Sequence, residues 1–298
     1  MHRGILERGY ASALAAVVIW ALVPVGTRFF VLSMDPYIFN GIRFLASCTA
    51  ALPLFVYAKP WRWPTHDKLL LLACALFAVP GYNIPVALGA RTVPAGALGL
   101  FIATEPVMIA ALSSLIERRP VHRRVVGGSL ISLLGVALTS GVFSAAHGFR
   151  WLSTVQVLTG ALSWSCYTVL AGRLNQRYGT FRVTGAIVVI GSLMLFAWSW
   201  PMVDAPNWPD RTTTLVVAAM GLSSSLLGFL LWNYAGAVVP AERLGLFLYM
   251  IPLVSVFAGA QFLQESLTVH ILAGGALTVL GVWIASRTVR DIPADATE

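Results

Sequence analysis

Residues 93–101 read VPAGALGLF, and residues 239–247 read VPAERLGLF, with seven identities in nine positions at an offset of 146 residues. Pro106 and Pro252 are separated by the same offset. Because this offset is close to half of the 298 residues, the match indicates that the chain contains an internal repeat.

The repeat extends beyond these two stretches. Each half runs on through a glutamate into a glycine-rich apolar segment, GGSLISLLGV from Gly127 and GGALTVLGV from Gly274. The sequence therefore predicts two units, residues 1–146 and residues 147–298.

The composition identifies a membrane protein. Of the residues, 58% are hydrophobic and 11% are charged, against about 45–50% and about 25% in an ordinary soluble domain. The net charge of +8 does not indicate a nucleic-acid partner, because the arginines lie between apolar runs and form no clustered basic face. The three cysteines lie inside apolar stretches, where a disulfide or a thiolate metal site is unusual. We therefore expect neither a redox role nor a bound metal.

Ten stretches are apolar and long enough to cross a bilayer, which takes about 20 residues of helix. They lie at residues 9–31, 36–57, 68–89, 93–116, 125–144, 154–172, 183–201, 213–238, 244–262 and 270–286. Each half holds five, and because five is odd the second half must enter the bilayer from the opposite face. The predicted fold is an all-α membrane protein of ten transmembrane helices, arranged as two inverted five-helix repeats.

The charged residues between the spans predict the orientation. With ten spans, 15 lysines and arginines lie on the side of the two termini, and three lie on the other side. Because positive charge favours cytoplasmic loops, we expect both termini in the cytoplasm.

Glu105 is an acidic residue near the middle of a predicted span. A charge at the bilayer centre costs about 2.5 kcal/mol or more and is retained mainly where it faces a cavity or a partner. One interpretation is that Glu105 meets a substrate ammonium or exchanges a proton. The other is a structural ion pair with Arg43, roughly 8 Å away in depth at about 1.5 Å per helical residue. Pro106 follows directly and predicts a kink, so Pro106 and its counterpart Pro252 are the predicted hinges.

Prolines also interrupt the third predicted span. Pro80 and Pro85 flank Tyr82 and Asn83, and backbone groups freed at such a break must be buried in protein or line a watery cavity. Tyr82 and Asn83 are therefore candidate cavity residues. For Asn83, a hydrogen bond between helices is an equal alternative.

Aromatic side chains are predicted at mid-depth in four spans. They are Trp20, Phe101, Trp164, Tyr167 and Tyr249. An indole or phenol in the bilayer core needs a polar partner, and a cavity wall provides one. Such a wall suits an aromatic substrate or an organic cation, although ordinary helix packing explains the same spacing.

Trp232, Asn233 and Tyr234 lie near the cytoplasmic end of the eighth span. They fit either an inner gate or an aromatic belt at the membrane interface, and the sequence favours the belt.

Two five-span halves, each with a proline-interrupted fourth helix, a glutamate near its exit and a glycine-rich fifth helix, resemble the drug/metabolite transporter superfamily, specifically its EamA-type exporters. Arg43, in FNGIRFLAS, and Trp20 lie where that family carries a second-helix arginine and a first-helix tryptophan. The resemblance implies a ten-helix bundle around a central cavity in a bacterial inner membrane. Similar members export amino acids, aromatic ones included, whereas others move other metabolites or organic cations.

We expect a secondary transporter that exports a small amphipathic metabolite, in the first place an amino acid, by alternating access of its two halves. The alternatives are an exporter of organic cations or drugs, a membrane-embedded enzyme and a scaffold. An enzyme is not expected, because the sequence has no P-loop, no paired carboxylates and no mid-span histidine. No cofactor is expected. The expected partners are a small-molecule substrate and membrane lipids, with protons left open, and the chain is expected to act as a monomer.

Overall fold

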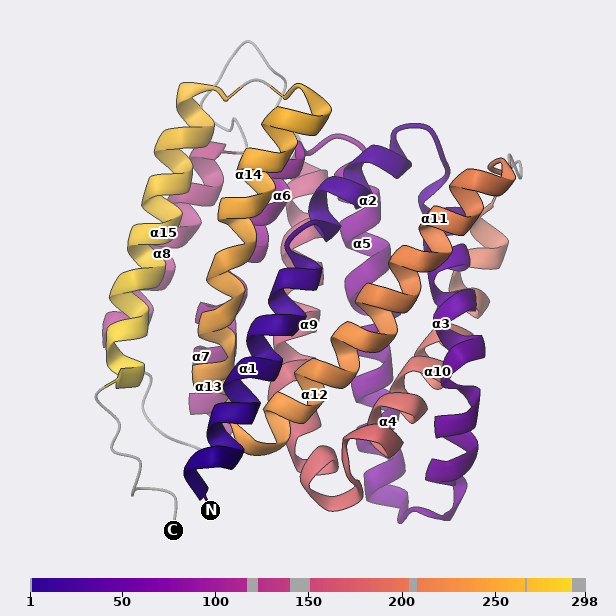
Figure 1. Ribbon diagram of the computed structural model, residues 1–298. Coiled ribbons are helices and arrows are strands. Elements are labelled where there is room, and N and C mark those ends of the chain that lie inside the picture. Colours follow the sequence, from indigo (N-terminus) through magenta and orange to yellow (C-terminus); the bar gives the residue numbers. More distant parts are fainter. Residues whose placement is uncertain (1, 117–122, 140–150, 204–207, 266, 291–298) are drawn as a thin grey trace.

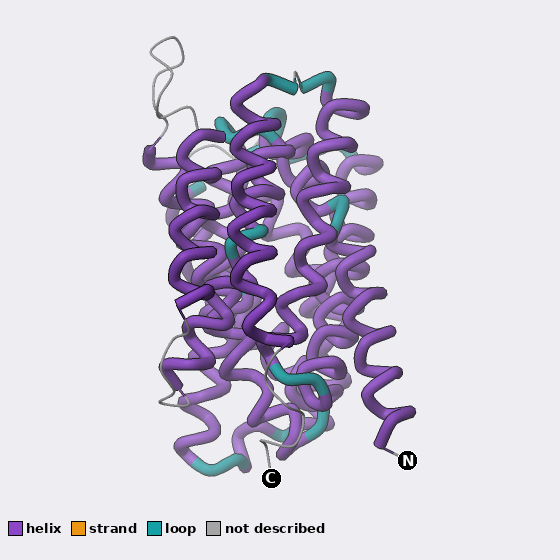
Figure 2. The backbone as a smooth tube through the Cα atoms, turned by 90° about the vertical axis from the view of Figure 1, so that its left-hand side faces the viewer, coloured by secondary structure: helices purple, strands orange, loops and turns teal. Residues whose placement is uncertain are grey.

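The computed structural model describes residues 2–116, 123–139, 151–203, 208–265 and 267–290. Within these ranges all regular secondary structure is helical, and the helices form an elongated bundle (Figure 1; Figure 2). The first half comprises α1 (His2–Trp20), α2 (Val23–Val31), α3 (Pro36–Ala58), η1 (Pro60–Arg62), α4 (Thr65–Ala78), α5 (Pro80–Ala90), α6 (Ala95–Ile102), α7 (Glu105–Ile116) and α8 (Arg123–Thr139). The second half comprises α9 (Trp151–Tyr178), α10 (Thr180–Ser199), η2 (Trp200–Met202), α11 (Arg211–Gly221), the π-helical η3 (Leu222–Leu227), α12 (Gly228–Val238), α13 (Ala241–Gly245), η4 (Leu246–Tyr249), α14 (Met250–Leu263) and α15 (Val269–Arg290).

Seven helical segments of the described chain are long and apolar enough to cross a membrane. They are Ile5–Val31, Pro36–Arg62, Thr65–Ala90, Ala95–Ile116, Thr180–Met202, Arg211–Val238 and Arg243–Leu263. Large apolar side chains such as Phe257 and Phe262 are more than 70% exposed on the outside of the bundle, as expected for surfaces that face lipid. The chain is therefore an all-helical, multi-pass membrane protein.

The other three predicted spans also fall on helices, but these do not belong to the set of seven. The span at 125–144 lies on α8, which has 17 residues, and its residues 140–144 lie outside the described part of the chain. The span at 270–286 lies on α15, whose apolar stretch is the shorter Val269–Gly281. The span at 154–172 lies on α9, which at 28 residues is longer than predicted. Its mean hydropathy is lower than that of helices in the seven segments, such as α1 and α11.

Three predicted breaks can be compared with the helices. The third span is interrupted at Val79, between α4 and α5, but α5 continues through Pro85 without interruption, so that part of the prediction is wrong. The fourth span is interrupted before Glu105, which places Pro106 in the first turn of α7. Likewise Pro252 lies in the first turn of α14, after the 3-10 segment η4. A proline in a first turn is tolerated because its missing N–H has no intrahelical partner there.

Two interruptions were not predicted. The first span breaks between α1 and α2, two residues before Pro24. The eighth span contains the π-helical segment η3, which includes Ser224 and Ser225 and no proline. A π-bulge widens the turn and leaves carbonyl groups without their usual partners, and the indole Nε1 of Trp20 donates to one of them, the carbonyl of Ser224, at 2.8 Å.

Helices of the two halves pack against one another throughout the bundle. The most extensive contacts join α8 to α15, α3 to α10 and α6 to α14, and also α5 to α9 and α1 to α12; α8 and α15 lie together at one edge (Figure 1). Since Gly9 near the start of α1 packs against Val238 and Val239 at the end of α12, these two helices are antiparallel. The end of the bundle at which α1 begins is called the N-terminal end below, and the other is called the far end.

Candidate functional site

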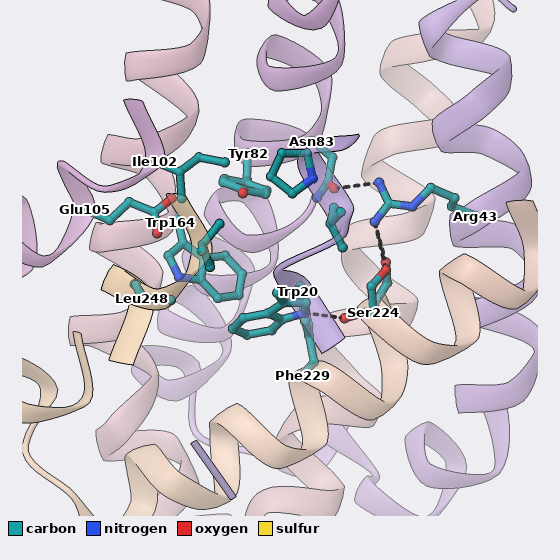
Figure 3. Close-up of a pocket in the computed structure, with 14 residues that line it drawn as sticks. Trp20, Arg43, Tyr82, Asn83, Ile102, Glu105, Trp164, Ser224, Phe229 and Leu248 are labelled. Atoms are coloured by element: carbon teal, nitrogen blue, oxygen red, sulfur yellow. Dashed lines mark hydrogen bonds between the residues drawn. The ribbon is translucent and has the colours of Figure 1, made fainter. Parts of the chain in front are cut away.

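A cavity of about 40 Å³ lies in the middle of the bundle, where the interrupted helices meet (Figure 3). It is lined by residues of both halves: Trp20, Val23, Pro24, Arg43, Tyr82, Asn83, Ile102, Glu105, Trp164, Ser224, Ser225, Phe229, Leu248 and Ile251. Six of the residues predicted from sequence are among them. This volume holds a few water molecules at most, since one water needs about 10–15 Å³ of such space.

Arg43 forms one end of the cavity (Figure 3) and is 4% exposed. Its Nη2 donates to the hydroxyls of Ser224 at 3.0 Å and Ser225 at 3.2 Å, both in the π-helical segment. Its Nη1 lies 3.4 Å from the side-chain oxygens of Asn40 and Asn83. All four partners are neutral, and among the described residues no carboxylate forms an ion pair with Arg43. The cavity therefore has a buried cation whose charge is not compensated by a neighbouring anion.

Glu105 lies at the opposite end of the cavity from Arg43 (Figure 3). The residue is 1% exposed, and its Oε1 is buried without a hydrogen-bond partner in the described part of the chain. A charged group left unpaired at this depth costs about 2.5–3.5 kcal/mol on insertion scales. Within the described residues this oxygen therefore has neither a donor nor a cation beside it, an arrangement that suits a protonated Glu105 or one that binds a cation from outside the protein.

Aromatic rings form the cavity wall between these two ends (Figure 3). Trp20 meets Trp164 edge to face, with ring centroids 5.0 Å apart and an interplanar angle of 89°. Tyr82 lies 5.3 Å and Phe229 lies 5.4 Å from Trp164. Trp164 thus contacts aromatic residues of both halves, and the wall presents a surface on which an apolar side chain or a cation can rest.

Asn83 lines the cavity, but its amide is also bonded to protein groups. Its Nδ2 donates to the carbonyls of Ala78 and Val79, at 3.2 and 2.9 Å. These carbonyls lie at the end of α4, where the helix is interrupted before Pro80, and an amide side chain is a good substitute for the missing backbone donors. The Asn83 side chain therefore stabilises the interruption between α4 and α5, and its Oδ1 accepts a hydrogen bond from Arg43.

Two predicted site residues lie elsewhere, and the side chain of a third, Tyr249, is not described. Phe101 is fully buried in an apolar cluster with Phe39 and Leu98. Tyr167 is fully buried and donates its hydroxyl to Oδ1 of Asn233 at 2.8 Å. Tyr249 belongs to η4, and its side chain lies outside the described part of the structure.

The predicted membrane belt at the end of α12 is not present at two of its three positions. Trp232 and Asn233 are each 1% exposed, and Tyr234 alone is exposed, at 37%. Besides Tyr167, Asn233 accepts from Nδ2 of Asn175 at 2.8 Å and donates to Thr184 at 2.9 Å. Buried residues that satisfy one another in this way cannot anchor the protein at the lipid surface.

Ser224, Ser225 and Phe229 are site residues that the sequence analysis did not find. The cluster of serines between Gly221 and Gly228 is the available signal, because small and hydroxylated residues in a membrane helix allow close helix contacts and interhelical hydrogen bonds. Within the described residues, no group of three or more His, Cys, Asp or Glu side chains could hold a metal ion.

Comparisons with known proteins agree with the helical membrane architecture. The model of the EamA-like transporter family matches twice, over residues 7–141 and 151–287. An "uncharacterized transporter" of Archaeoglobus fulgidus is 26% identical over 91% of this chain and 96% of that protein. A "probable terminal-alkyne amino-acid exporter" of Streptantibioticus cattleyicolor is 25% identical, with 95% and 94% covered. A "probable amino-acid metabolite efflux pump" of Salmonella typhimurium is 23% identical, with 91% and 92% covered.

One solved crystal structure superposes on the chain with a TM-score of 0.67 at 17% sequence identity. The superposition covers 95% of this chain and 98% of the other. At this identity the likeness concerns the fold alone.

Proposed function

This chain belongs to the EamA-like transporter family, and we propose that it is a secondary transporter that exports amino acids with apolar or aromatic side chains across the bacterial inner membrane. It is a membrane transporter rather than an enzyme. The observation that carries the finer proposal is the central cavity, in which an unpaired Glu105 and an uncompensated Arg43 lie at opposite ends of an aromatic wall.

A zwitterionic amino acid matches these three features. Its ammonium supplies the cation that Glu105 lacks, and its carboxylate supplies the anion that Arg43 lacks. Its side chain packs against the rings of Trp20 and Trp164. Because a cavity of about 40 Å³ is too small for such a ligand, the helices must separate when it binds. Two relatives are named as an amino-acid exporter and an amino-acid efflux pump, which supports this substrate class.

We propose that alternating access uses two inverted halves, residues 1–146 and 147–298. Gly135 packs closely against Thr278, since a Cβ added to this glycine would clash with the threonine hydroxyl. In the same way Gly281 packs closely against Ser132. Each residue of one contact lies 146 positions from its counterpart in the other. Such an exchange of equivalent contacts is typical of a two-fold axis.

A second pair of contacts repeats the relation. Gly99 packs against Ser255, and Gly245, 146 residues later, packs against Ile109. Contact positions decrease along α15 as they increase along α8, so these equivalent helices run antiparallel, which an axis in the membrane plane requires. The junction near residue 146 lies outside the described ranges.

The orientation is also part of the proposal. The excess of lysine and arginine on the side of the termini supports a cytoplasmic N-terminal end, so that the far end faces outward. Pro106 and Pro252 are proposed as hinges because each follows directly on an interrupted segment of helix.

The test is counterflow in proteoliposomes. Vesicles loaded with unlabelled phenylalanine should accumulate labelled phenylalanine, and Glu105→Gln should reduce this to background while the exposed Glu7→Gln leaves it unchanged. A panel of aromatic, aliphatic and polar amino acids then defines the range of substrates. Absence of counterflow with every amino acid would contradict the proposal.

A second candidate, export of organic cations, is favoured by the same unpaired Glu105 and aromatic wall. The two proposed substrate classes differ in the role of Arg43, which binds the carboxylate of an amino acid but has no role in binding an organic cation. Arg43→Gln should weaken phenylalanine counterflow and spare that of tetraphenylphosphonium if both are substrates.

Proton coupling is tested in the same vesicles. An imposed pH gradient drives substrate uptake in a proton antiporter, and Glu105→Gln should abolish the dependence of uptake on the gradient.

A further inference from the structure

A second and larger cavity lies at the N-terminal end of the bundle. Its volume is about 360 Å³, within the range of small-molecule sites and far above the central cavity. The ends of α7, α9 and α12 surround it, and we call it the vestibule. Its lining includes Ser113, Thr168, Gly172, Arg173 and Gly236.

The vestibule carries polar groups that the protein leaves unused. Ser113 is 3% exposed, and its hydroxyl is buried without a hydrogen-bond partner in the described chain. Arg173 is exposed, and within the described residues no hydrogen bond or ion pair holds its guanidinium. By contrast Arg177, on the same helix, is paired with Asp67 at 3.0 Å. A guanidinium and an unpaired hydroxyl in the wall of one cavity are suited to bind a carboxylate.

Trp232 contacts residues of both cavities. Its ring lies 5.2 Å from Trp20 of the central wall, and its Nε1 donates to the hydroxyl of Thr168, in the vestibule, at 3.4 Å. At about 1.5 Å per residue, the step along α9 from the central wall to Thr168 is only about 6 Å.

We propose that the vestibule is a loading site, where Arg173 binds the carboxylate of the amino acid before Trp232 moves aside and admits it to the central cavity. This inference rests on the proposed function, because it takes the same substrate class. The size of the vestibule supports it, since in this conformation an amino acid fits there and not in the centre. Its place at the end with the positive loops supports loading from the cytoplasm.

The experiment compares the two faces of the membrane. In vesicles of known orientation, Arg173→Gln should raise the KM for labelled phenylalanine about fivefold at the N-terminal face, because a partly exposed ion pair contributes on the order of 1 kcal/mol. The KM at the far face should stay unchanged. Arg173→Lys should leave the KM close to that of the wild type. Arg182→Gln removes a half-buried arginine at the same end of the bundle but outside the vestibule, and it should leave the KM unchanged.

Phenylalaninamide, which lacks the carboxylate, isolates the contact. As an inhibitor at the N-terminal face it should bind the wild type and Arg173→Gln equally well. Two further variants examine the cavity itself. Gly172→Leu places a side chain where the built Cβ meets only the carbonyl of Gly236 at 3.4 Å, so it should fill the vestibule and slow uptake at that face several-fold. Trp232→Phe should speed uptake at the N-terminal face, because loss of the hydrogen bond to Thr168 lets this side chain move aside more easily.

The outcomes are distinct. An unchanged KM in Arg173→Gln, with active phenylalanine counterflow, overturns the loading site and leaves the proposed function intact. A KM effect that disappears in vesicles of purely zwitterionic lipid assigns Arg173 to lipid headgroups and also overturns it. If the wild type exchanges no amino acid at all, the proposed function fails, and the loading site fails with it.

Discussion

Replacement of Gly228 by alanine should disturb the central aromatic wall. Gly228 is the first residue of α12, and a Cβ built there lies 2.4 Å from Nε1 and 2.9 Å from Cε2 of Trp20. The indole cannot retreat freely, because Trp164 and Trp232 lie 5.0 and 5.2 Å from it. Either α12 shifts or the ring rotates, and rotation breaks its hydrogen bond to the carbonyl of Ser224.

The expected cost follows from three contributions. Overpacking costs about 1–3 kcal/mol, and the lost indole hydrogen bond costs about 0.5–1.5 kcal/mol. The better helix propensity of alanine returns about 1 kcal/mol. The net loss is about 2 kcal/mol, which corresponds to a fall in Tm of roughly 3 °C for a chain of this size.

Thermal unfolding in mild detergent provides the measurement. Gly41→Ala, in α3, is the matched control, because a Cβ there meets nothing within 4 Å, and its Tm should stay the same or rise. In a Trp20→Phe background the smaller ring leaves room, so Gly228→Ala should lose most of its effect. Equal Tm values for Gly228→Ala and Gly41→Ala would refute the reasoning, as would full additivity with Trp20→Phe.

Three other predictions concern parts of the bundle outside the cavity. Glu265→Gln should lower the Tm by several degrees, because this carboxylate accepts the first backbone N–H groups of α6 at 3.0 and 3.4 Å and so ties the two halves together at the far end; a Tm equal to wild type would show that this contact contributes nothing. Asn233→Leu should cost about 3 kcal/mol, since it leaves three buried partners unpaired, whereas Tyr167→Phe should cost about 1 kcal/mol; chemical unfolding should separate the two variants, and equal losses would contradict the network. The side-chain hydroxyl and backbone N–H of Thr213 lower the pKa of Asp210, the N-cap of α11. Its contribution to stability is therefore present above the ordinary carboxyl pKa and is lost as the pH falls through the lowered value, so Asp210→Ala should flatten the acid side of a plot of Tm against pH.

Some of the architecture was predictable because it depends on composition and on local patterns. Apolar runs of membrane length identified the helices, and the identities between residues 93–101 and 239–247 revealed the repeat. Glu105 was recognisable because a mid-span carboxylate is costly wherever the helix lies. The family assignment follows from these same features, and the match of the family model over both halves agrees with it.

The interruptions were only partly predictable. A proline removes a backbone donor whatever surrounds it, yet Pro85 lies inside an intact α5. The π-helical segment η3 contains no proline, and its opened carbonyl is satisfied by Trp20, about 200 residues away in sequence. Such a segment forms where tertiary partners compensate it, so a local pattern cannot reveal it.

By itself, then, the sequence determined that the chain is a duplicated helical membrane protein with a costly carboxylate and aromatic residues at mid-depth. Only the tertiary structure decided which of these side chains share a cavity. Trp164 and Tyr167 lie three residues apart on one helix, yet Trp164 lines the central cavity whereas Tyr167 bonds to Asn233. The tertiary structure also brought Arg43 to the π-helical serines and opened the vestibule beside Arg173. The physical reason is that helical periodicity fixes only the direction of a side chain around its own axis, whereas what it meets depends on helices from the other half of the chain.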